Sequence, residues 1–124
     1  MTSANIKLGQ QGETAAISFL QTQGFVILET NYRTKPAEID IIANDNECIC
    51  FIEVKTRTNL KKGLPRESVN YSKQKKIITG SLFYLKEKNL MNSKIRFDVI
   101  EVIKNNNNFN INLIKHAFQV HAKS

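Results

Sequence analysis

Residues 38–57 constrain the fold more than any other stretch of this chain, because they are typical of two β-strands joined by a tight polar turn. A two-residue turn places Asp40 opposite Glu53 and Glu38 opposite Lys55. Side chains alternate between the two faces of a sheet, so these four charged residues are predicted to share one face. The pattern therefore predicts a hairpin with an unusual concentration of charge at its open end.

The two faces of this predicted hairpin differ in polarity. We expect the uncharged face to be core, since it carries only the apolar residues Ile39, Ile41, Ala43, Cys50, Ile52 and Val54. Apolar residues on the charged face lie near the turn, at Ile42, Ile49 and Phe51, while the far end gathers three carboxylates beside one lysine. Like charges at short range repel and raise one another's pKa. A divalent metal ion beside the lysine would remove this conflict, so the hairpin predicts a metal site.

Length and composition favour a single domain over residues 1–124, with an ordered core over about 8–118. The longest uninterrupted apolar run, residues 48–52, has five residues, against roughly 20 needed to span a bilayer. Residues 1–11 are polar and lack the apolar segment of a signal peptide. We therefore expect a cytoplasmic protein without a membrane partner. Two cysteines in one predicted strand and two distant histidines give no zinc-ligand pattern.

Basic residues are concentrated in the second part of the chain. The net charge is +7, but residues 1–54 carry three basic and seven acidic residues, so residues 55–124 carry +11. This excess favours polyanionic partners, nucleic acid and most of all DNA, although a solvated basic face is the plainer alternative. The basic segment 55–76 begins directly beyond the acidic cluster, which is the arrangement that a nuclease requires. The predicted phosphate contacts are Arg57, Lys61, Lys62, Lys73, Lys75 and Lys76.

Apolar periodicity and turn residues predict the order of elements. The expected elements are a helix over 8–23, a strand over 25–32, the hairpin, a long helix over about 67–88, and strands over 95–103 and 109–118. This order is typical of an α/β domain with a mixed central sheet of about five strands flanked by helices, and it permits a parallel pair around the long helix. On that helix, Leu82, Phe83 and Leu85 are expected to widen the apolar face. Loop 58–65 is expected to lie over the site.

Three charged residues outside the hairpin each have a structural and a functional interpretation. Glu13 is either an exposed helical acid favoured by the helix dipole or an additional acid that faces the metal. Lys73 starts from the inward side of the long helix and either extends along apolar surface to water or reaches the site. Asp98 is expected to pair with Arg96 or to bond to backbone, which is a structural role.

The chemistry of the hairpin favours Mg²⁺ or Mn²⁺. Such ions prefer oxygen ligands and usually keep several waters, so two carboxylates and a backbone carbonyl suffice. Asp40 and Glu53 are the predicted direct ligands, and the carbonyl of Val54 is the third candidate. Lys55 could orient or help deprotonate a metal-bound water, or stabilise charge on a phosphate. Further carboxylates for a second ion or for its waters are available from Glu38 and Glu13.

The pattern Asp-x₁₂-Glu-x-Lys on adjacent strands, preceded by a helical glutamate, resembles the Asp…(Asp/Glu)-x-Lys signature of the restriction-endonuclease-like nuclease superfamily. The surrounding segments narrow this resemblance to the bacterial YraN-type family, and it covers about residues 8–103. The segments are Gly9…Gly12-Glu13-x-x-Ala16, Asn31-Tyr32-Arg33, Glu38-Ile39-Asp40-Ile41-Ile42-Ala43, Phe51-Ile52-Glu53-Val54-Lys55-Thr56-Arg57, Lys73 and Arg96-Phe97-Asp98-Val99.

This resemblance implies a restriction-endonuclease-like core, a mixed sheet with a helix on each side, similar to that of archaeal Holliday-junction resolvases. It also implies catalytic roles for Glu13, Asp40, Glu53 and Lys55. The sequence departs from the common pattern because no proline precedes Asp40. Glu38 stands two residues before it instead, a variation seen in the resolvase-like branch.

Three functions remain open from the sequence. The first is a Mg²⁺-dependent endonuclease acting on DNA, including branched or structured DNA; a resolvase would need two sites related by two-fold symmetry, hence a homodimer. The second is a non-catalytic nucleic-acid-binding module of a DNA-processing complex. The third is a purely structural domain in which Glu38 pairs across the hairpin with Lys55.

Overall fold

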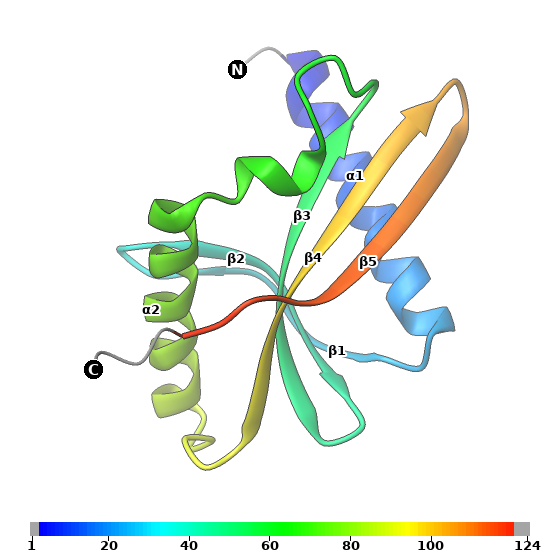
Figure 1. The fold of residues 1–124 in the computed structure, drawn as a ribbon. Coiled ribbons are helices and arrows are strands. Elements are labelled where there is room, and N and C mark those ends of the chain that lie inside the picture. The colour runs from blue at the N-terminus through cyan, green and yellow to red at the C-terminus, as the bar shows by residue number, and fades with distance from the viewer. Residues whose placement is uncertain (1–2, 121–124) are drawn as a thin grey trace.

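The computed structural model describes residues 3–120 (Figure 1). Its elements follow the order that the sequence predicts. They are α1 (Ser3–Thr22), β1 (Val26–Arg33), β2 (Glu38–Asp45), β3 (Cys48–Arg57), the short 3-10 helix η1 (Pro65–Ser68), α2 (Tyr71–Glu87), β4 (Lys94–Asn105) and β5 (Asn108–Phe118). The predicted α/β class, with a five-stranded sheet and two helices, is confirmed.

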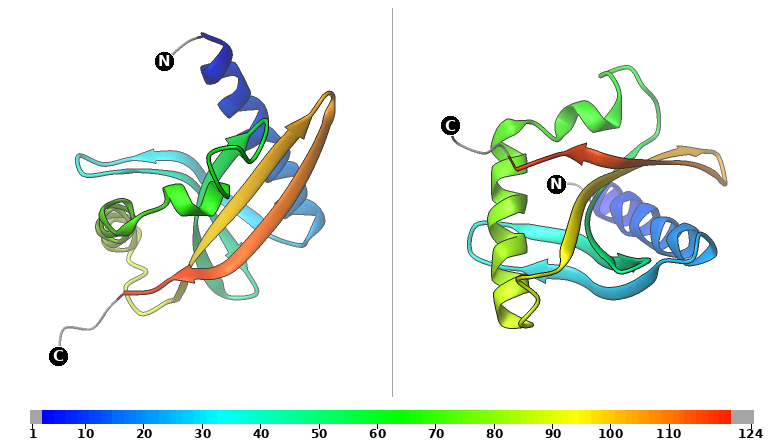
Figure 2. Two further views of the ribbon diagram at one scale, coloured as in Figure 1. Left: turned by 45° about the horizontal axis from the view of Figure 1, so that its top comes forward. Right: turned by 60° about the horizontal axis from the view of Figure 1, so that its bottom comes forward.

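The sheet is mixed, and its spatial order β1-β2-β3-β4-β5 follows the chain. β3 and β4 pair in parallel, and the other neighbouring strands within residues 3–120 are antiparallel. The connection between β3 and β4 passes through η1 and α2, as expected for a parallel crossover. α1 and α2 cover opposite faces of the sheet, which the views in Figures 1 and 2 show from three directions.

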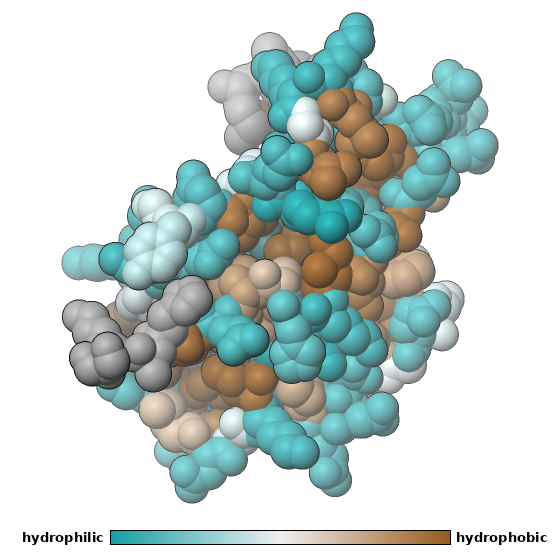
Figure 3. Space-filling model, viewed as in Figure 1, coloured by the Kyte–Doolittle hydropathy of each residue, from teal (hydrophilic) through white to brown (hydrophobic). Residues whose placement is uncertain are grey.

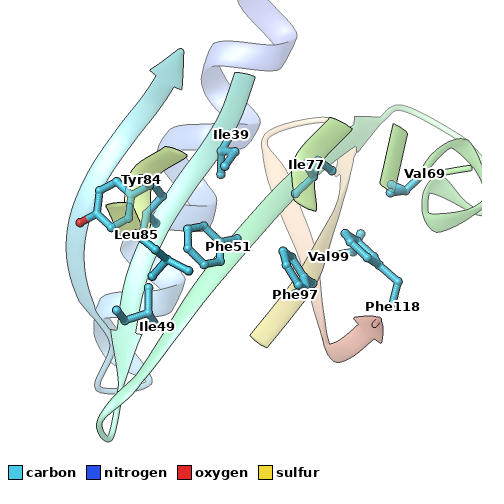
Figure 4. Packing of buried hydrophobic residues seen from close by; sticks show 11 residues of the cluster. Ile39, Ile49, Phe51, Val69, Ile77, Tyr84, Leu85, Phe97, Val99 and Phe118 are labelled. Atoms are coloured by element: carbon cyan, nitrogen blue, oxygen red, sulfur yellow. The ribbon is translucent and has the colours of Figure 1, made fainter. Parts of the chain in front are cut away.

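Each face of the sheet has its own core. The cluster under α2, much of which Figure 4 shows, contains Ile39, Ile42, Ile49, Phe51, Val69, Ile77, Tyr84, Leu85, Phe97, Val99 and Phe118. The cluster under α1 contains Ala16, Leu20, Phe25, Ile41, Ala43, Cys50, Ile52, Ile100 and Val102. Strands that are covered on both sides carry nearly continuous apolar runs instead of alternating ones. This explains why the hairpin is apolar on both of its faces near the turn.

The predicted hairpin register is confirmed. Asn46 and Glu47 form the two-residue turn, with the positive φ values of 48° and 69° that such turns favour. The ladder pairs Asp45 with Cys48 and continues to the pair Ile41–Ile52, where it ends. The strands therefore separate one residue before Asp40 would face its partner. In Figure 1, β1 and β2 curve toward α2, while β3 continues beside β4.

The predicted assignment of Ile39 to the uncharged face of the hairpin is wrong because the strands separate. Ile39 was expected to share a face with Ile41, yet Ile39 packs in the α2 cluster and Ile41 in the α1 cluster. Strict alternation holds only while a strand stays in one sheet plane. Beyond Ile41, β2 leaves β3 and remains paired with β1 alone.

Both helices differ from their predicted limits. α1 begins at Ser3 and not at residue 8, since its first turn lacks the apolar stripe that reveals a helix in sequence. The long helix is divided into η1 and α2, because Asn70 is extended and its Oδ1 accepts a hydrogen bond from the backbone N of Lys73 at 3.0 Å. Leu82 and Phe83 do not widen the buried face; they are 43% and 51% exposed.

The structural interpretation of Asp98 is confirmed. Arg96 donates three hydrogen bonds of 2.9–3.1 Å to its carboxylate. The backbone N of His116 adds a fourth at 3.1 Å, where β5 bulges and His116 has a φ of 53°. This network fixes the end of the sheet that lies beyond the C-terminus of α1.

The surface of one side of the molecule, in Figure 3, shows apolar residues over the central sheet with hydrophilic residues around them. None of the helices within residues 3–120 has the length and apolar character needed to cross a membrane.

Candidate active site

Asp40 lies at the point where β2 leaves β3. Its Oδ2 accepts a hydrogen bond from the backbone N of Val54 at 2.8 Å. A buried N–H group needs an acceptor, and here the side chain supplies one that strand pairing no longer provides. The separation of the strands therefore brings the carboxylate of Asp40 between β2 and β3 and holds it in one orientation.

The carboxyl groups of Asp40 and Glu53 are in hydrogen-bonding contact at this fork. Burial, followed by this hydrogen bond and by repulsion from Glu53, raises the pKa of Asp40 to about 9; the N–H of Val54 offsets only part of the effect. Glu53 is 5% exposed. Two carboxylates in contact repel each other when both are ionised, and a cation nearby would relieve that repulsion.

Lys73 is the nearest cation to this pair. Its Nζ lies 3.1 Å from Oε2 of Glu53. Yet this buried oxygen accepts no well-directed hydrogen bond from any side chain or backbone group in residues 3–120, so its only close partner is a charge. In the structure the ammonium group of Lys73 therefore reaches the site instead of extending along apolar surface to water.

Lys55 lies two residues beyond Glu53 on β3 and is half-buried. Burial lowers the pKa of its ammonium group, while the negative charge of Glu53 acts in the opposite direction and the charge of Lys73 lowers it further. An amine whose pKa is lowered gives up its proton more readily than an exposed lysine does.

Glu13 reaches the same region from α1. Asn31 Nδ2 donates a hydrogen bond of 2.8 Å to its Oε1. Burial raises the pKa of Glu13, the hydrogen bond from Asn31 lowers it, and the charges of Glu38 and Glu53 raise it again. Glu13 therefore lies near enough to the acids of the hairpin for their charges to affect its pKa.

A glycine allows this approach of α1. A Cβ atom at Gly12 would overlap the side chain of Thr56 on β3. Since no other residue type lacks a Cβ, the helix can pack this closely to β3 only with glycine at position 12. Glu13 is the next residue, so the contact between Gly12 and Thr56 sets its height above the sheet.

Glu38 is not brought into the carboxyl pair. It forms an ion pair with Arg33, whose Nε lies 3.5 Å from Glu38 Oε2. Within residues 3–120, no three His, Cys, Asp or Glu side chains lie close enough to hold one metal ion together. The cross-strand pair of Glu38 with Lys55, on which the purely structural function depended, does not form either, because the ladder ends before it.

The predicted phosphate-binding residues other than Lys73 make no ion pair with the carboxyl pair in the described residues 3–120. Arg57 Nη1 bonds to the carbonyl O of Thr56 at 2.9 Å, and Lys75 Nζ lies 4.7 Å from the centre of the Tyr71 ring. The other three are exposed, on the loop after β3 and on α2: Lys61, Lys62 and Lys76.

Comparison with known proteins decides the family. The family model of the uncharacterised protein family UPF0102 matches residues 12–102. The chain belongs to this family. A UPF0102 protein of Desulforapulum autotrophicum is 49% identical over 119 residues, which cover 96% of this chain and 98% of that protein. A UPF0102 protein of Clostridium botulinum strain 657 is 47% identical over 123 residues, which cover 97% and 100%. The expected YraN-type family is thereby confirmed.

Sequence reasoning missed one fixed element of this UPF0102 site. Arg66 in η1 donates two side-chain hydrogen bonds to Glu101, of 3.0 and 3.1 Å, and its backbone N donates a third of 2.9 Å. Burial alone would raise the pKa of Glu101, but the hydrogen bonds from Arg66 and Asn112 lower it. Glu101 pairs with Lys55 in the β3–β4 ladder, so this contact fixes the end of the basic loop beside the site. The available signal was a second acid, beside the Arg96-paired Asp98, in the otherwise apolar middle of β4.

The donor set fits Mg²⁺ or Mn²⁺. Mg²⁺ is commonly held by one or two carboxylates and keeps its remaining ligands as waters. Asp40 and Glu53 supply two adjacent carboxylates, and the buried Oε2 of Glu53 lacks a hydrogen-bond donor. A divalent cation would relieve the repulsion within the pair and satisfy that oxygen.

Proposed function

We propose that this UPF0102 protein is a Mg²⁺- or Mn²⁺-dependent endonuclease that hydrolyses phosphodiester bonds in DNA, with branched or structured DNA as its substrate class. The observation that carries the proposal is the pair formed by the half-buried Asp40 and the buried Glu53, which has an unsatisfied oxygen and lies beside two lysines. The resemblance of this constellation to the restriction-endonuclease-like superfamily supports it, as does a mixed sheet with one helix on each face.

Each residue of the site has a separate role in the proposed hydrolysis. Asp40 and Glu53 would hold the metal, which when bound polarises a phosphoryl oxygen and lowers the pKa of a water. Lys55, with its lowered pKa, orients the attacking water and stabilises negative charge on the phosphate. Glu13 is held by Asn31 in a position to orient further waters.

Lys73 has a different part in this mechanism. In the absence of metal its ammonium group compensates the charge of Glu53. With a cation bound by Asp40 and Glu53, Lys73 would be available to the phosphate backbone. Together with Arg57, Lys61, Lys62, Lys75 and Lys76 it would form the electrostatic approach for DNA, which makes binding strongly dependent on salt.

A cleavage assay tests the proposal. The protein is incubated with linear, flap and four-way DNA in Mg²⁺, in Mn²⁺ and in EDTA. We expect cleavage only with metal, and a loss of about 10³-fold in Asp40→Asn and in Glu53→Gln, since the metal supplies several kcal/mol of transition-state stabilisation. Glu47→Gln, which changes an exposed acid in the turn of the same hairpin, is the matched control and should retain activity. Cleavage that survives both site variants would refute the assignment.

A second function is favoured by one observation. Because Lys73 already compensates Glu53, the site can remain charge-balanced without a metal. This is what a non-catalytic nucleic-acid-binding module would need. Salt-dependent binding of DNA or RNA, with no metal-dependent cleavage of any substrate, would establish that alternative; cleavage of four-way DNA at two symmetric positions would instead indicate a homodimer.

A further inference from the structure

A basic hollow of about 600 Å³ lies between the β1–β2 turn and the C-terminal half of α2. Its lining includes three cations, two aromatic rings and one acid: Arg33, Lys35, Lys86, Phe83, Tyr32 and Glu87. We call it the turn–helix hollow. Figures 1 and 2 show the β1–β2 turn beside α2 in every view. None of these residues belongs to the carboxyl pair or to the predicted phosphate contacts.

The walls of the turn–helix hollow are fixed. The hydroxyl of Tyr32 donates a hydrogen bond of 3.1 Å to Glu87, and its ring meets that of Tyr84 edge-on, with centroids 5.2 Å apart. The turn is closed by hydrogen bonds of 2.9 and 3.1 Å from the backbone N and the hydroxyl of Thr34 to the carbonyl O of Ala37. The cations next to these groups therefore start from a backbone that does not need to be ordered on binding.

The chemistry of the hollow favours a nucleic-acid strand. Phe83 leaves 51% of its surface exposed beside three cations, against the single acid Glu87. Proteins that bind single strands combine a positive groove with aromatic rings on which bases stack. The ion pair of Arg33 with Glu38 is at the surface, where such pairs are weak, so Arg33 can exchange it for a phosphate. An acidic peptide would use the cations but would leave the phenyl ring without a partner.

The elements that line the hollow also carry residues of the candidate active site. Arg33 pairs with Glu38 in the β1–β2 ladder, and Asp40 is two residues further along β2. Lys73 and Phe83 are ten residues apart on α2, which corresponds to about 15 Å at a rise of 1.5 Å per residue. A stacked strand rises about 3.4 Å per nucleotide, so about four nucleotides span this distance.

We propose that the turn–helix hollow binds a single-stranded segment of the nucleic acid about four nucleotides from the candidate active site. A base stacks on Phe83, and phosphates contact Arg33, Lys35 and Lys86. This inference rests on the proposed function for the kind of polymer that is bound, and it makes a single-stranded arm part of the preferred substrate.

Equilibrium binding in EDTA tests this without requiring cleavage. The probes are one fluorescent DNA duplex in four forms: blunt, with a two-nucleotide tail, and with an eight-nucleotide tail at either the 5′ or the 3′ end. We expect the eight-nucleotide tail of one polarity to tighten binding of the wild type about fivefold or more, since stacking of one base alone supplies about that much. The two-nucleotide tail is too short to reach Phe83 and should have no effect.

Phe83→Ala should remove the advantage of the long tail and leave binding of the blunt duplex unchanged. The matched control is Leu82→Ala, an exposed apolar residue that precedes Phe83 on α2 and does not line the hollow. A long-tail advantage that persists in Phe83→Ala overturns the proposal. So does a Phe83→Ala variant that only lowers the self-association of the protein in size-exclusion chromatography, which would make the hollow a contact between copies. If the wild type binds the blunt duplex but cuts nothing, the catalytic proposal fails while the hollow is still tested.

Discussion

Two regions of the sheet hold buried or half-buried carboxylates, and the charges of these carboxylates are compensated in different ways. Asp98 is fully buried on β4, and its charge is matched by Arg96 through three hydrogen bonds and by the backbone N of His116. Asp40 and Glu53 at the fork contact each other, and within residues 3–120 the ammonium group of Lys73 is the only close partner of Glu53 Oε2. A carboxylate whose charge is fully matched by an arginine stabilises the fold. A carboxyl pair that is only partly compensated still has oxygen lone pairs available to bind a cation.

The pKa values express the same difference. Burial tends to raise the pKa of Asp45, which also contacts Arg96, but the hydrogen bonds from Arg96 and Lys115 lower it. Burial and Glu53 together raise the pKa of Asp40 to about 9. Groups with pKa values raised by burial and by a specific charge partner are concentrated at functional sites. Charge compensation, and not burial, therefore distinguishes the structural network from the candidate site.

The largest effect on stability is expected at the hydrogen-bond network of Arg96 and Asp98. Arg96→Met leaves Asp98 as a buried charge without its main partner and should lower the free energy of unfolding by about 3–5 kcal/mol, measured by urea denaturation. Adding Asp98→Leu removes the uncompensated charge and should restore part of this loss. A decrease below about 1 kcal/mol in the single variant would show that the network does not stabilise the sheet.

Asp40→Asn should raise the free energy of unfolding, whereas Arg96→Met should lower it. The folded-state pKa of Asp40 is about 9, above the value of about 3.9 in an unfolded chain. Between these values the native state binds more protons, so the stability of the metal-free protein falls as pH rises. Asparagine cannot ionise and keeps an oxygen for the N–H of Val54. We expect it to stabilise the protein by about 1–3 kcal/mol at pH 8 and by much less at pH 4.5, measured by urea denaturation in EDTA. A destabilisation at both pH values would remove the contrast with Asp98.

Metal binding at the Asp40–Glu53 pair should stabilise the folded protein. At a Mn²⁺ concentration ten times the Kd, the wild type should gain about 1.4 kcal/mol, observed as a higher Tm. Asp40→Asn and Glu53→Gln should show no such gain, and Glu47→Gln should show the full one. An equal gain in all four proteins would place the metal elsewhere.

The smallest effect is expected for the ammonium group that competes with the metal. Lys73→Met keeps an unbranched side chain but removes the charge 3.1 Å from Glu53 Oε2. The Kd for Mn²⁺, measured by calorimetry, should then decrease about three- to tenfold, which is up to about 1.4 kcal/mol. Lys76→Met, an exposed lysine on the same helix, is the control. Weaker binding in Lys73→Met would mean that the lysine positions Glu53 instead of competing for it.

The sequence by itself determined the order of elements, the α/β class and the hairpin register. These follow from local properties: apolar periodicity, and a two-residue turn at Asn46 and Glu47 whose backbone permits one pairing only. The pairing of Asp98 with Arg96 was predictable for the same reason, since both lie two residues apart on one strand. The family followed from motifs that lie in sequence order along the chain.

Only the tertiary structure decided how the site is assembled. The separation of β2 from β3 at Asp40, the ion pair of Lys73 with Glu53 and the hydrogen bonds of Arg66 to Glu101 join groups from different elements. The exposure of Phe83 likewise depends on which side of α2 meets the sheet. Such contacts are set by how helices pack on a twisted sheet, and local patterns carry little information about that. The hairpin thus fixed which carboxylates could meet, and the packing around it decided that Asp40 and Glu53 do.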